Sequence, residues 1–176
     1  MLYVQQSLGP NEELVHIGKF HWMYTVAAFM AIVWGVIISI LIIVGAIVVY
    51  HQMGWFQPGF TLLDEIRGLH PIVRIFSFIV FVMGLLSFAQ MMVIKATTEI
   101  AITNNRLIYK RGLIARQVGE ISIDRIEGVN VLQSILGRLL DYGRLAIRGM
   151  GIGEVILPPI EDPIKFRQAI EKARSL

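Results

Sequence analysis

The polarity of the chain changes abruptly near residue 94, and two long apolar runs precede that point. The first run, residues 24–50, carries no charge, and fifteen of its residues are Leu, Ile, Val or Phe. The second ends in twenty uncharged residues, 75–94, which extend about 30 Å as a helix, the thickness of a bilayer's hydrocarbon core. Twelve of these twenty are of the same four types and contribute on the order of −4 to −7 kcal/mol to insertion. We therefore predict membrane spans over residues 24–50 and 72–94.

Small residues in both runs predict that the two spans pack against each other. Gly35 and Ser39 share one face of the first span, and the second span offers Ser77, Gly84 and Ser87. Small side chains let helix backbones approach closely within a membrane. The sequence therefore predicts a transmembrane hairpin.

The connector between the spans, residues 51–71, is too short to form a domain. Thr61 is a residue type that caps helices, Gly68 is one that ends them, and Pro71 suits the first turn of the second span. Positively charged residues favour the cytoplasmic side of a membrane. They number two near the connector, Arg67 and Arg74, and five on the outer flanks, Lys19, Lys95, Arg106, Lys110 and Arg111. We expect an external connector and two cytoplasmic termini.

After residue 94 the apolar residues alternate with polar ones, as in strands. Residues 100–103 and 106–111 flank Asn104-Asn105, which predicts a β-hairpin. Further strands are predicted over residues 117–123, over 126–132, around Leu145 and Ile147, and over 155–157.

Two helices are predicted among these strands. Residues 134–142 have apolar side chains at helical spacing and precede Gly143, where a helix usually stops: Ile135, Leu136, Leu139 and Leu140. The last helix has Asp162 as its N-cap and Pro163 as its first residue. Its apolar face contains Phe166, Ala169, Ile170 and Ala173. Because a flat sheet of short strands leaves its edges open, we predict a small, partly closed barrel with this helix over one end.

Several motifs in this order resemble the bacterial PH-like domain of small two-span membrane proteins. They are residues 102–108, 111–114, 120–126, 129–134, 136–140 and Tyr142-Gly143, preceded by residues 7–12 and His21-Trp22 before the first span. The resemblance covers nearly the whole chain and implies no reaction. The expected fold is thus a two-helix transmembrane hairpin plus a small mostly-β PH-like barrel with a C-terminal α-helix. Its parts are a cytoplasmic N-terminal segment (1–23), the hairpin (24–94) and the PH-like domain (95–176).

Charge and composition narrow the expected chemistry. Residues 95–176 carry a net charge of +4, a modest excess that suits anionic head groups better than nucleic acid. With no cysteine, the chain forms no disulfide and no thiolate metal site. Four histidines, His16, His21, His51 and His70, are the remaining metal-ligand candidates, and an interfacial role is the better interpretation. We expect no bound metal or cofactor.

Two further patterns have a structural explanation. The Gly149-Met150-Gly151-Ile152-Gly153 run resembles a nucleotide loop but leads into a predicted strand, which favours a hairpin turn. Glu120, Asp124 and Glu127 resemble an acid and base set, but they alternate with apolar residues and surround Arg125, which favours a solvated, charge-paired face. We therefore expect no enzyme activity.

One turn is a candidate site for membrane lipids. Three cations bracket two aliphatic residues in it: Lys110, Arg111, Leu113, Ile114 and Arg116. The aliphatic pair would enter the head groups while the cations bind anionic lipid. Alternatively, Leu113 and Ile114 cover the barrel core, which is the commoner place for aliphatic residues.

These observations favour a membrane-anchored, non-catalytic interaction or scaffolding module at the cytoplasmic face of the bacterial inner membrane. Its partners would be membrane lipids and either another membrane protein or a second copy of the chain. The first alternative is a sensor of anionic lipids. The second is an accessory subunit of a membrane transport complex, which is disfavoured because neither span core contains an ionisable residue.

Overall fold

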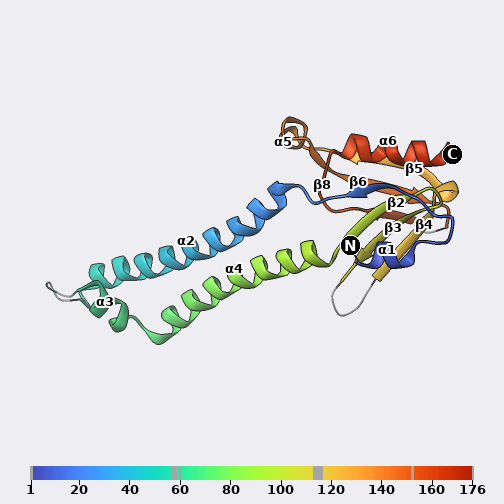
Figure 1. The fold of residues 1–176 in the computed structure, drawn as a ribbon. Helices are drawn as coiled ribbons and strands as arrows, with labels where there is room; N and C mark the ends of the chain where they lie inside the picture. The colour runs from blue at the N-terminus through green and yellow to red at the C-terminus, as the bar shows by residue number, and fades with distance from the viewer. Residues whose placement is uncertain (1, 57–58, 60, 113–116, 152, 176) are drawn as a thin grey trace. The chain divides into compact units, whose positions relative to one another are not determined.

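The computed structural model describes residues 2–56, 59, 61–112, 117–151 and 153–175. The chain forms two compact units (Figure 1). The helical unit consists of Thr25–Met92, and the strand-rich unit consists of Met1–Tyr24 with Val93–Leu176. From the sequence, residues 1–23 were predicted to be a separate segment. In the structure they belong to the strand-rich unit. The strand-rich unit is thus built from chain segments that precede and follow the two apolar helices in the sequence.

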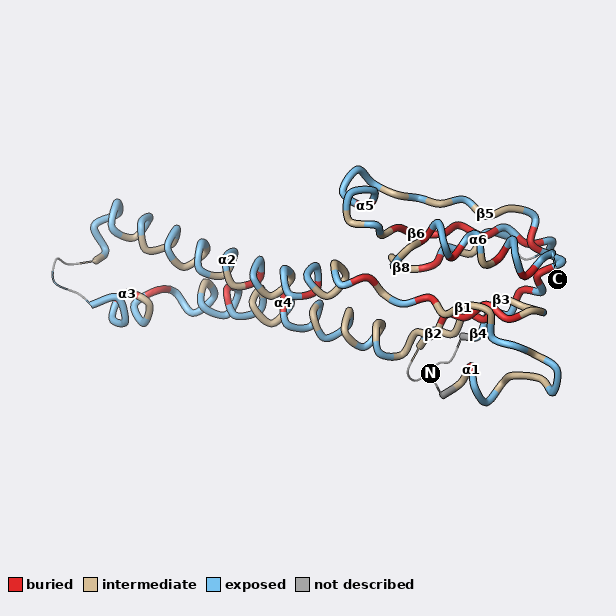
Figure 2. The backbone as a smooth tube through the Cα atoms, turned by 45° about the horizontal axis from the view of Figure 1, so that its top comes forward, coloured by how far each residue is buried: buried red, intermediate tan, exposed pale blue. Residues whose placement is uncertain are grey.

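Two long helices, α2 (Trp22–Gln52) and α4 (Pro71–Thr97), are long and apolar enough to cross a membrane. Their apolar side chains are largely exposed in the structure (Figure 2), and Trp34 and Leu41 are 59% and 63% exposed. A helix that is apolar on all sides is normally buried, either in a protein core or in a membrane. Since these side chains are not buried by protein, lipid is the environment that suits them.

The two long helices meet through small residues, as the sequence predicted. A Cβ atom added to Gly35 would lie 3.0 Å from the Cα atom of Gly84, so the backbones are in close contact there. The hydroxyls of Ser39 and Ser77 are 2.7 Å apart. The Ser77 hydroxyl also donates a hydrogen bond to the Ser39 carbonyl oxygen at 3.0 Å. The predicted packing of the two apolar helices as a hairpin is confirmed.

The connector contains a short helix, α3 (Leu62–Gly68), between the capping residue Thr61 and the stop at Gly68 that the sequence indicated. The Thr61 side chain accepts a hydrogen bond from the Asp64 amide, and the Asp64 carboxylate accepts one from the Thr61 amide. This reciprocal pair satisfies amides that the first turn leaves without partners. The helix ends at Gly68 and α4 begins at Pro71, both as expected.

The strand-rich unit contains two antiparallel sheets (Figure 1). The first sheet has the order β1 (Leu14–Gly18), β2 (Glu99–Thr103), β3 (Arg106–Arg111) and β4 (Gln117–Ser122). The second has β5 (Ile126–Leu132), β6 (Tyr142–Gly149) and β7 (Gly153–Ile156) in order, while β8 (Ile160–Glu161) also pairs with β6. The remaining elements are α1 (Leu2–Ser7), the 3₁₀ turn η1 (Ile123–Arg125), α5 (Ile135–Leu139) and α6 (Pro163–Arg174).

The strands follow the predicted pattern, with two additions, β1 and the two-residue β8. β2 and β3 form the expected hairpin around Asn104-Asn105, with Ile102 opposite Leu107. The glycine run, of which Ile152 lies outside the described residues, connects β6 to β7 as expected, and Gly149 pairs with Gly153. β1 was not predicted: it pairs with β2, and Ile17 lies opposite Ala101. A strand that precedes the apolar region thus completes a sheet that follows it.

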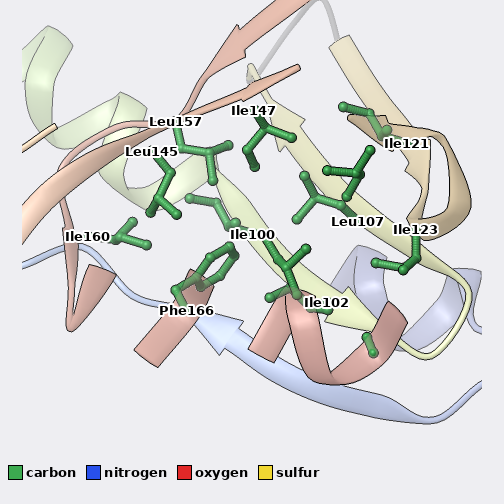
Figure 3. Packing of buried hydrophobic residues seen from close by; sticks show 13 residues of the cluster. Ile100, Ile102, Leu107, Ile121, Ile123, Leu145, Ile147, Leu157, Ile160 and Phe166 are labelled. Atoms are coloured by element: carbon green, nitrogen blue, oxygen red, sulfur yellow. The ribbon is translucent and has the colours of Figure 1, made fainter. Parts of the chain in front are cut away.

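The main apolar core lies between the two sheets and α6 (Figure 3). Alternate residues of β2 and β6 point into it, among them Ile100, Leu145 and Ile147. The predicted apolar face of α6 is confirmed, because Phe166, Ile170 and Ala173 are buried in this core and Ala169 packs against it. Fully burying side chains of this size stabilises a fold by about 1.5 to 3 kcal/mol each. The core therefore fixes how the sheets and α6 pack together.

The sheets do not close into a barrel, which corrects one part of the predicted fold. Among the described strands, β4 pairs only with β3 and β5 pairs only with β6. The η1 turn separates β4 from β5, so the chain changes sheets there instead of continuing the ladder. α6 contacts β1, β2, β5 and β6. A helix therefore fills the opening that further strand pairing would have closed.

Two local predictions were right only in part. Asp162 is the N-cap of α6 and Pro163 its first residue, as predicted, but Asp162 has a left-handed backbone (φ 45°) and its side chain makes no capping hydrogen bond. Its carboxylate instead accepts a hydrogen bond from Lys165 Nζ at 3.0 Å. The helix at 134–142 is shorter than predicted, since α5 ends at Leu139 and Gly143 belongs to β6.

Candidate interaction surfaces

The first residues of the chain cover the outer face of the first sheet. We call residues 2–13, which include α1, the N-terminal cover. Val4 of α1 is buried against Ala101 of β2 and Ile108 of β3, whose side chains point away from the main core. This apolar contact is small, so polar contacts are needed to fix the cover in place.

Glu99 holds the start of the N-terminal cover. Its carboxylate accepts hydrogen bonds from the amides of Tyr3 and Val4, both at 3.2 Å, and from Lys110 Nζ at 3.1 Å. Lys110 also lies 5.3 Å from the centre of the Tyr3 ring, a cation-π contact. Burial raises the pKa of Glu99, but these hydrogen bonds and the Lys110 charge outweigh burial and lower it from its ordinary value.

Arg106 and Glu12 hold the other end of the cover. The Nε and Nη2 atoms of Arg106 donate to the two Glu12 carboxylate oxygens at 2.9 and 2.8 Å. Arg106 Nη2 also donates to the Ser7 carbonyl at 2.6 Å, and Nη1 donates to Glu120 at 2.8 Å. Paired parallel hydrogen bonds of this kind are among the stronger polar contacts in proteins.

The Glu12 carboxylate is nearly enclosed, with only 4% of its side chain exposed. It also accepts hydrogen bonds from the Thr103 hydroxyl at 2.7 Å and the Gly9 amide at 2.9 Å. Burial raises the pKa of Glu12, yet the hydrogen bonds and the Arg106 charge outweigh it, so this pKa is lowered. Two of the motifs that carried the family resemblance, residues 7–12 and 102–108, thus bind each other.

A groove follows β1 on the side away from β2. Its volume is about 420 Å³, and it is lined by residues 14–17, Lys19, Glu161 and Asp162. Among the described strands, β1 pairs only with β2, so Leu14–Gly18 form an edge strand. Just beyond it this edge is occupied, because the Lys19 carbonyl accepts a hydrogen bond from the Glu161 amide at 2.9 Å and Phe20 bridges Ile160. The groove offers both charges, with Lys19 just after the strand and the carboxylates of Glu161 and Asp162 also in its lining. An edge strand beside a groove is suited to bind an extended peptide.

A family model described as a bacterial PH domain matches residues 58–174. The chain belongs to the bacterial PH domain family. Neither the comparison with curated proteins nor that with solved structures found a match. The match extends from the connector through α4 and the strands to the end of α6. PH domains are typically non-catalytic interaction modules, and the bacterial PH domain together with the two apolar helices supports a membrane-associated module.

The turn at residues 110–116 lies only partly within the described residues. Leu113, Ile114 and Arg116 fall outside them. Lys110 is engaged by Glu99 and Tyr3, and only 14% of its side chain is exposed. Arg111 is exposed at the end of β3. Lipid contact at this turn of the PH domain stays a prediction.

The other sequence candidates have structural partners. His16 packs edge-on against Phe166, His21 stacks on Tyr142, and His51 hydrogen-bonds Glu65 at 2.8 Å. Glu120 pairs with Arg106, where the sequence suggested Arg125. Within the described part of the PH-domain chain, no three His, Cys, Asp or Glu side chains lie close enough together to hold a metal ion.

Sequence reasoning missed both the groove and the cover. The motifs that contain Glu12 and Arg106 were each recognised in the sequence. Their pairing was not predicted, because the two residues lie far apart along the chain. The groove depends on β1, whose five residues are too few to give a clear strand pattern.

Proposed function

We propose that this protein is a membrane-anchored interaction module whose PH-like domain binds an extended protein segment along β1 at the cytoplasmic face of the bacterial inner membrane. The observation that carries this proposal is the open edge of β1 beside the groove. Backbone hydrogen bonds to the strand would supply affinity, and the charges of Lys19 and Glu161 would select among segments.

The pairing of β1 with β2 supports the membrane arrangement. β1 precedes α2 and β2 follows α4, yet the two strands share one sheet. Both must therefore lie on the same side of a membrane, so the intervening chain must cross it an even number of times. Two spans satisfy this condition, and the excess of positive residues on the outer flanks favours the cytoplasm for the domain.

Anchoring explains why a shallow groove would suffice. A domain held at the membrane meets membrane-bound partners at a high effective concentration, so each contact need not be strong. The N-terminal cover would also favour binding, because it holds β2 and β3 in place without a partner and does not line the groove along β1.

The test is photo-crosslinking in intact cells with the full chain. A photoreactive amino acid replaces Lys19, which is exposed at the groove, or Gln168, which is exposed on α6 outside the groove. We expect a protein adduct from position 19 and none from position 168. Charge reversal by Glu161→Lys in the same chain should weaken the position-19 adduct several-fold.

The products separate the possible partners. An adduct of twice the chain mass would identify the partner as a second copy. Adducts with lipid alone, or equal protein adducts from both positions, would contradict the proposal and leave the lipid-sensing alternative in its place. Loss of the adduct in Glu161→Lys must occur at unchanged protein abundance, which immunoblotting of the membrane fraction checks.

A further inference from the structure

Helix α5 exposes an unusual amount of apolar surface. Ile135 and Leu139 are 89% and 79% exposed, and Leu136 is 58% exposed. Leu132, just before the helix, is 50% exposed. The connection between β5 and β6 therefore ends in an apolar tip, which we define as Leu132, Ile135, Leu136 and Leu139. Contiguous apolar surface of this kind usually marks a contact with another molecule or with a membrane.

Local hydrogen bonds hold the apolar tip in a defined conformation. The Ser134 hydroxyl accepts a hydrogen bond from the Gly137 amide at 3.1 Å and caps the helix. The Gln133 side chain donates to the carbonyls of Gly137 and Tyr142, at 3.4 and 3.2 Å, and so ties the two ends of the loop together. A Cβ atom on Gly137 would lie 2.6 Å from the Tyr142 carbonyl oxygen, so this close approach requires glycine. Local hydrogen bonding thus holds the aliphatic side chains outward.

The tip is tied to the residue that precedes the first long apolar helix. The Tyr142 ring stacks on the His21 ring with 5.0 Å between centres and 23° between planes. His21 is followed by Trp22, the first residue of α2, which is 53% exposed. Tryptophan at the end of an apolar helix is typical of the membrane interface. Within the strand-rich unit, α5 (Figure 1) is therefore anchored beside the point where the chain enters α2.

The charges around the tip favour a lipid surface. Arg138 in the last turn of α5 and Arg144 on β6 are both exposed, and Arg144 lies opposite Leu132. Asp141 is the acidic residue nearest in sequence and is also exposed. Aliphatic side chains flanked by arginines suit the boundary between acyl chains and anionic head groups.

We propose that the apolar tip inserts into the interfacial layer of the bilayer that α2 enters, with Arg138 and Arg144 on anionic head groups. This site goes beyond the protein-binding groove, and neither depends on the other. It requires that α2 crosses the membrane. The tip would set the orientation of the domain relative to the bilayer, while the two spans supply the anchoring.

The absence of cysteine allows a direct test with single labels on the full chain. Ile135→Cys and Leu139→Cys are each labelled with an environment-sensitive fluorophore, and the proteins are reconstituted in nanodiscs of phosphatidylcholine and phosphatidylglycerol. Gln168→Cys, exposed on α6, is the matched control. We expect blue-shifted emission at positions 135 and 139 and a loss of emission when the lipids carry a spin-label quencher near the head group. The control label should show neither change.

Two outcomes would overturn the proposal. Equal lipid quenching at positions 135, 139 and 168 would mean that the tip has no special membrane contact. Blue-shifted emission without lipid quenching would mean that protein, such as a second copy, covers the tip. The double change Arg138→Glu with Arg144→Glu should reduce quenching in anionic nanodiscs and leave it unchanged in phosphatidylcholine alone. Since all these side chains are exposed, thermal unfolding of each variant should match that of the unmodified chain.

Discussion

We expect Arg106 to contribute more to stability than an arginine in an exposed ion pair, because its partner Glu12 is nearly enclosed. Replacing it by alanine leaves Glu12, which is 4% exposed, without its bidentate partner. Breaking a buried ion pair from one side costs roughly 3 to 5 kcal/mol. We expect about 2 kcal/mol for Arg106→Ala, because Arg106 itself is 27% exposed and water can partly replace it.

The measurement is thermal or urea unfolding of the full chain in detergent, followed through the strand signal in circular dichroism. Arg148→Ala is the matched control, because its partner Glu154 lies at 3.3 Å but the two side chains are 64% and 40% exposed. Exposed pairs contribute roughly 0.2 to 1 kcal/mol. Equal losses for the two variants would contradict a structural role of the N-terminal cover.

Acid should loosen the N-terminal cover. The pKa values of Glu12 and Glu99 are lowered in the folded protein from a value of 4.5. The folded state therefore binds fewer protons than the unfolded state below that pH. The stabilisation is fully present above about pH 4.5 and is lost as the pH falls through the folded pKa values.

The melting temperature measured from neutral to acid pH checks this expectation. It should fall below about pH 4.5, and Glu12→Gln should lower it at neutral pH while making its acid dependence shallower. Glu154→Gln, at an exposed pair, should leave the profile unchanged. An acid dependence that is the same in Glu12→Gln and the unmodified chain would rule out this carboxylate as a source.

The close contact between α2 and α4 depends on Gly84. A Cβ atom there would lie 2.9 Å from the Ala31 carbonyl oxygen and 3.0 Å from the Gly35 Cα atom, both in the facing backbone. Gly84→Leu should therefore force the helices apart. Gly45→Leu is the matched control, because a Cβ atom at Gly45 meets nothing within 4 Å.

Crosslinking reports this separation. Ser39 and Ser77, whose hydroxyls are 2.7 Å apart, are both changed to cysteine in the otherwise cysteine-free chain. Oxidation should join them readily within one chain, Gly84→Leu should reduce the yield to background, and Gly45→Leu should leave it intact. Efficient joining in Gly84→Leu would show that the helix pair does not need this glycine.

The elements that the sequence predicted well are those whose signal is local. Both long helices, α3 with its Thr61 cap, the β2–β3 hairpin and the apolar face of α6 each depend on residues close together in the chain. β1 was missed because its five residues are held as a strand by pairing with β2, which follows the apolar region far along the chain. The exposure of Ile135 and Leu139 was missed because helical spacing identifies an apolar face but not what covers it.

At the scale of the whole molecule, the shared first sheet constrains topology. Reporter fusions placed after residue 176 and before residue 1 should report the same compartment, the cytoplasm, and a fusion within the connector near Trp55 should report the opposite one. Reporters at the two ends that disagree would contradict the pairing of β1 with β2 in the membrane. Agreement on the external side would reverse only the orientation.

The pairing of β1 with β2 also has a consequence for the order of events during synthesis. β1 leaves the ribosome before either long helix, but its partner strand is made only after both helices are complete. Until then the first eighteen residues have no sheet to join, so both long helices must be synthesised before the domain can fold. Once β1 pairs with β2, one sheet holds the two chain segments that lead into and out of the helices, and separating those two segments would require breaking the β1–β2 pairing.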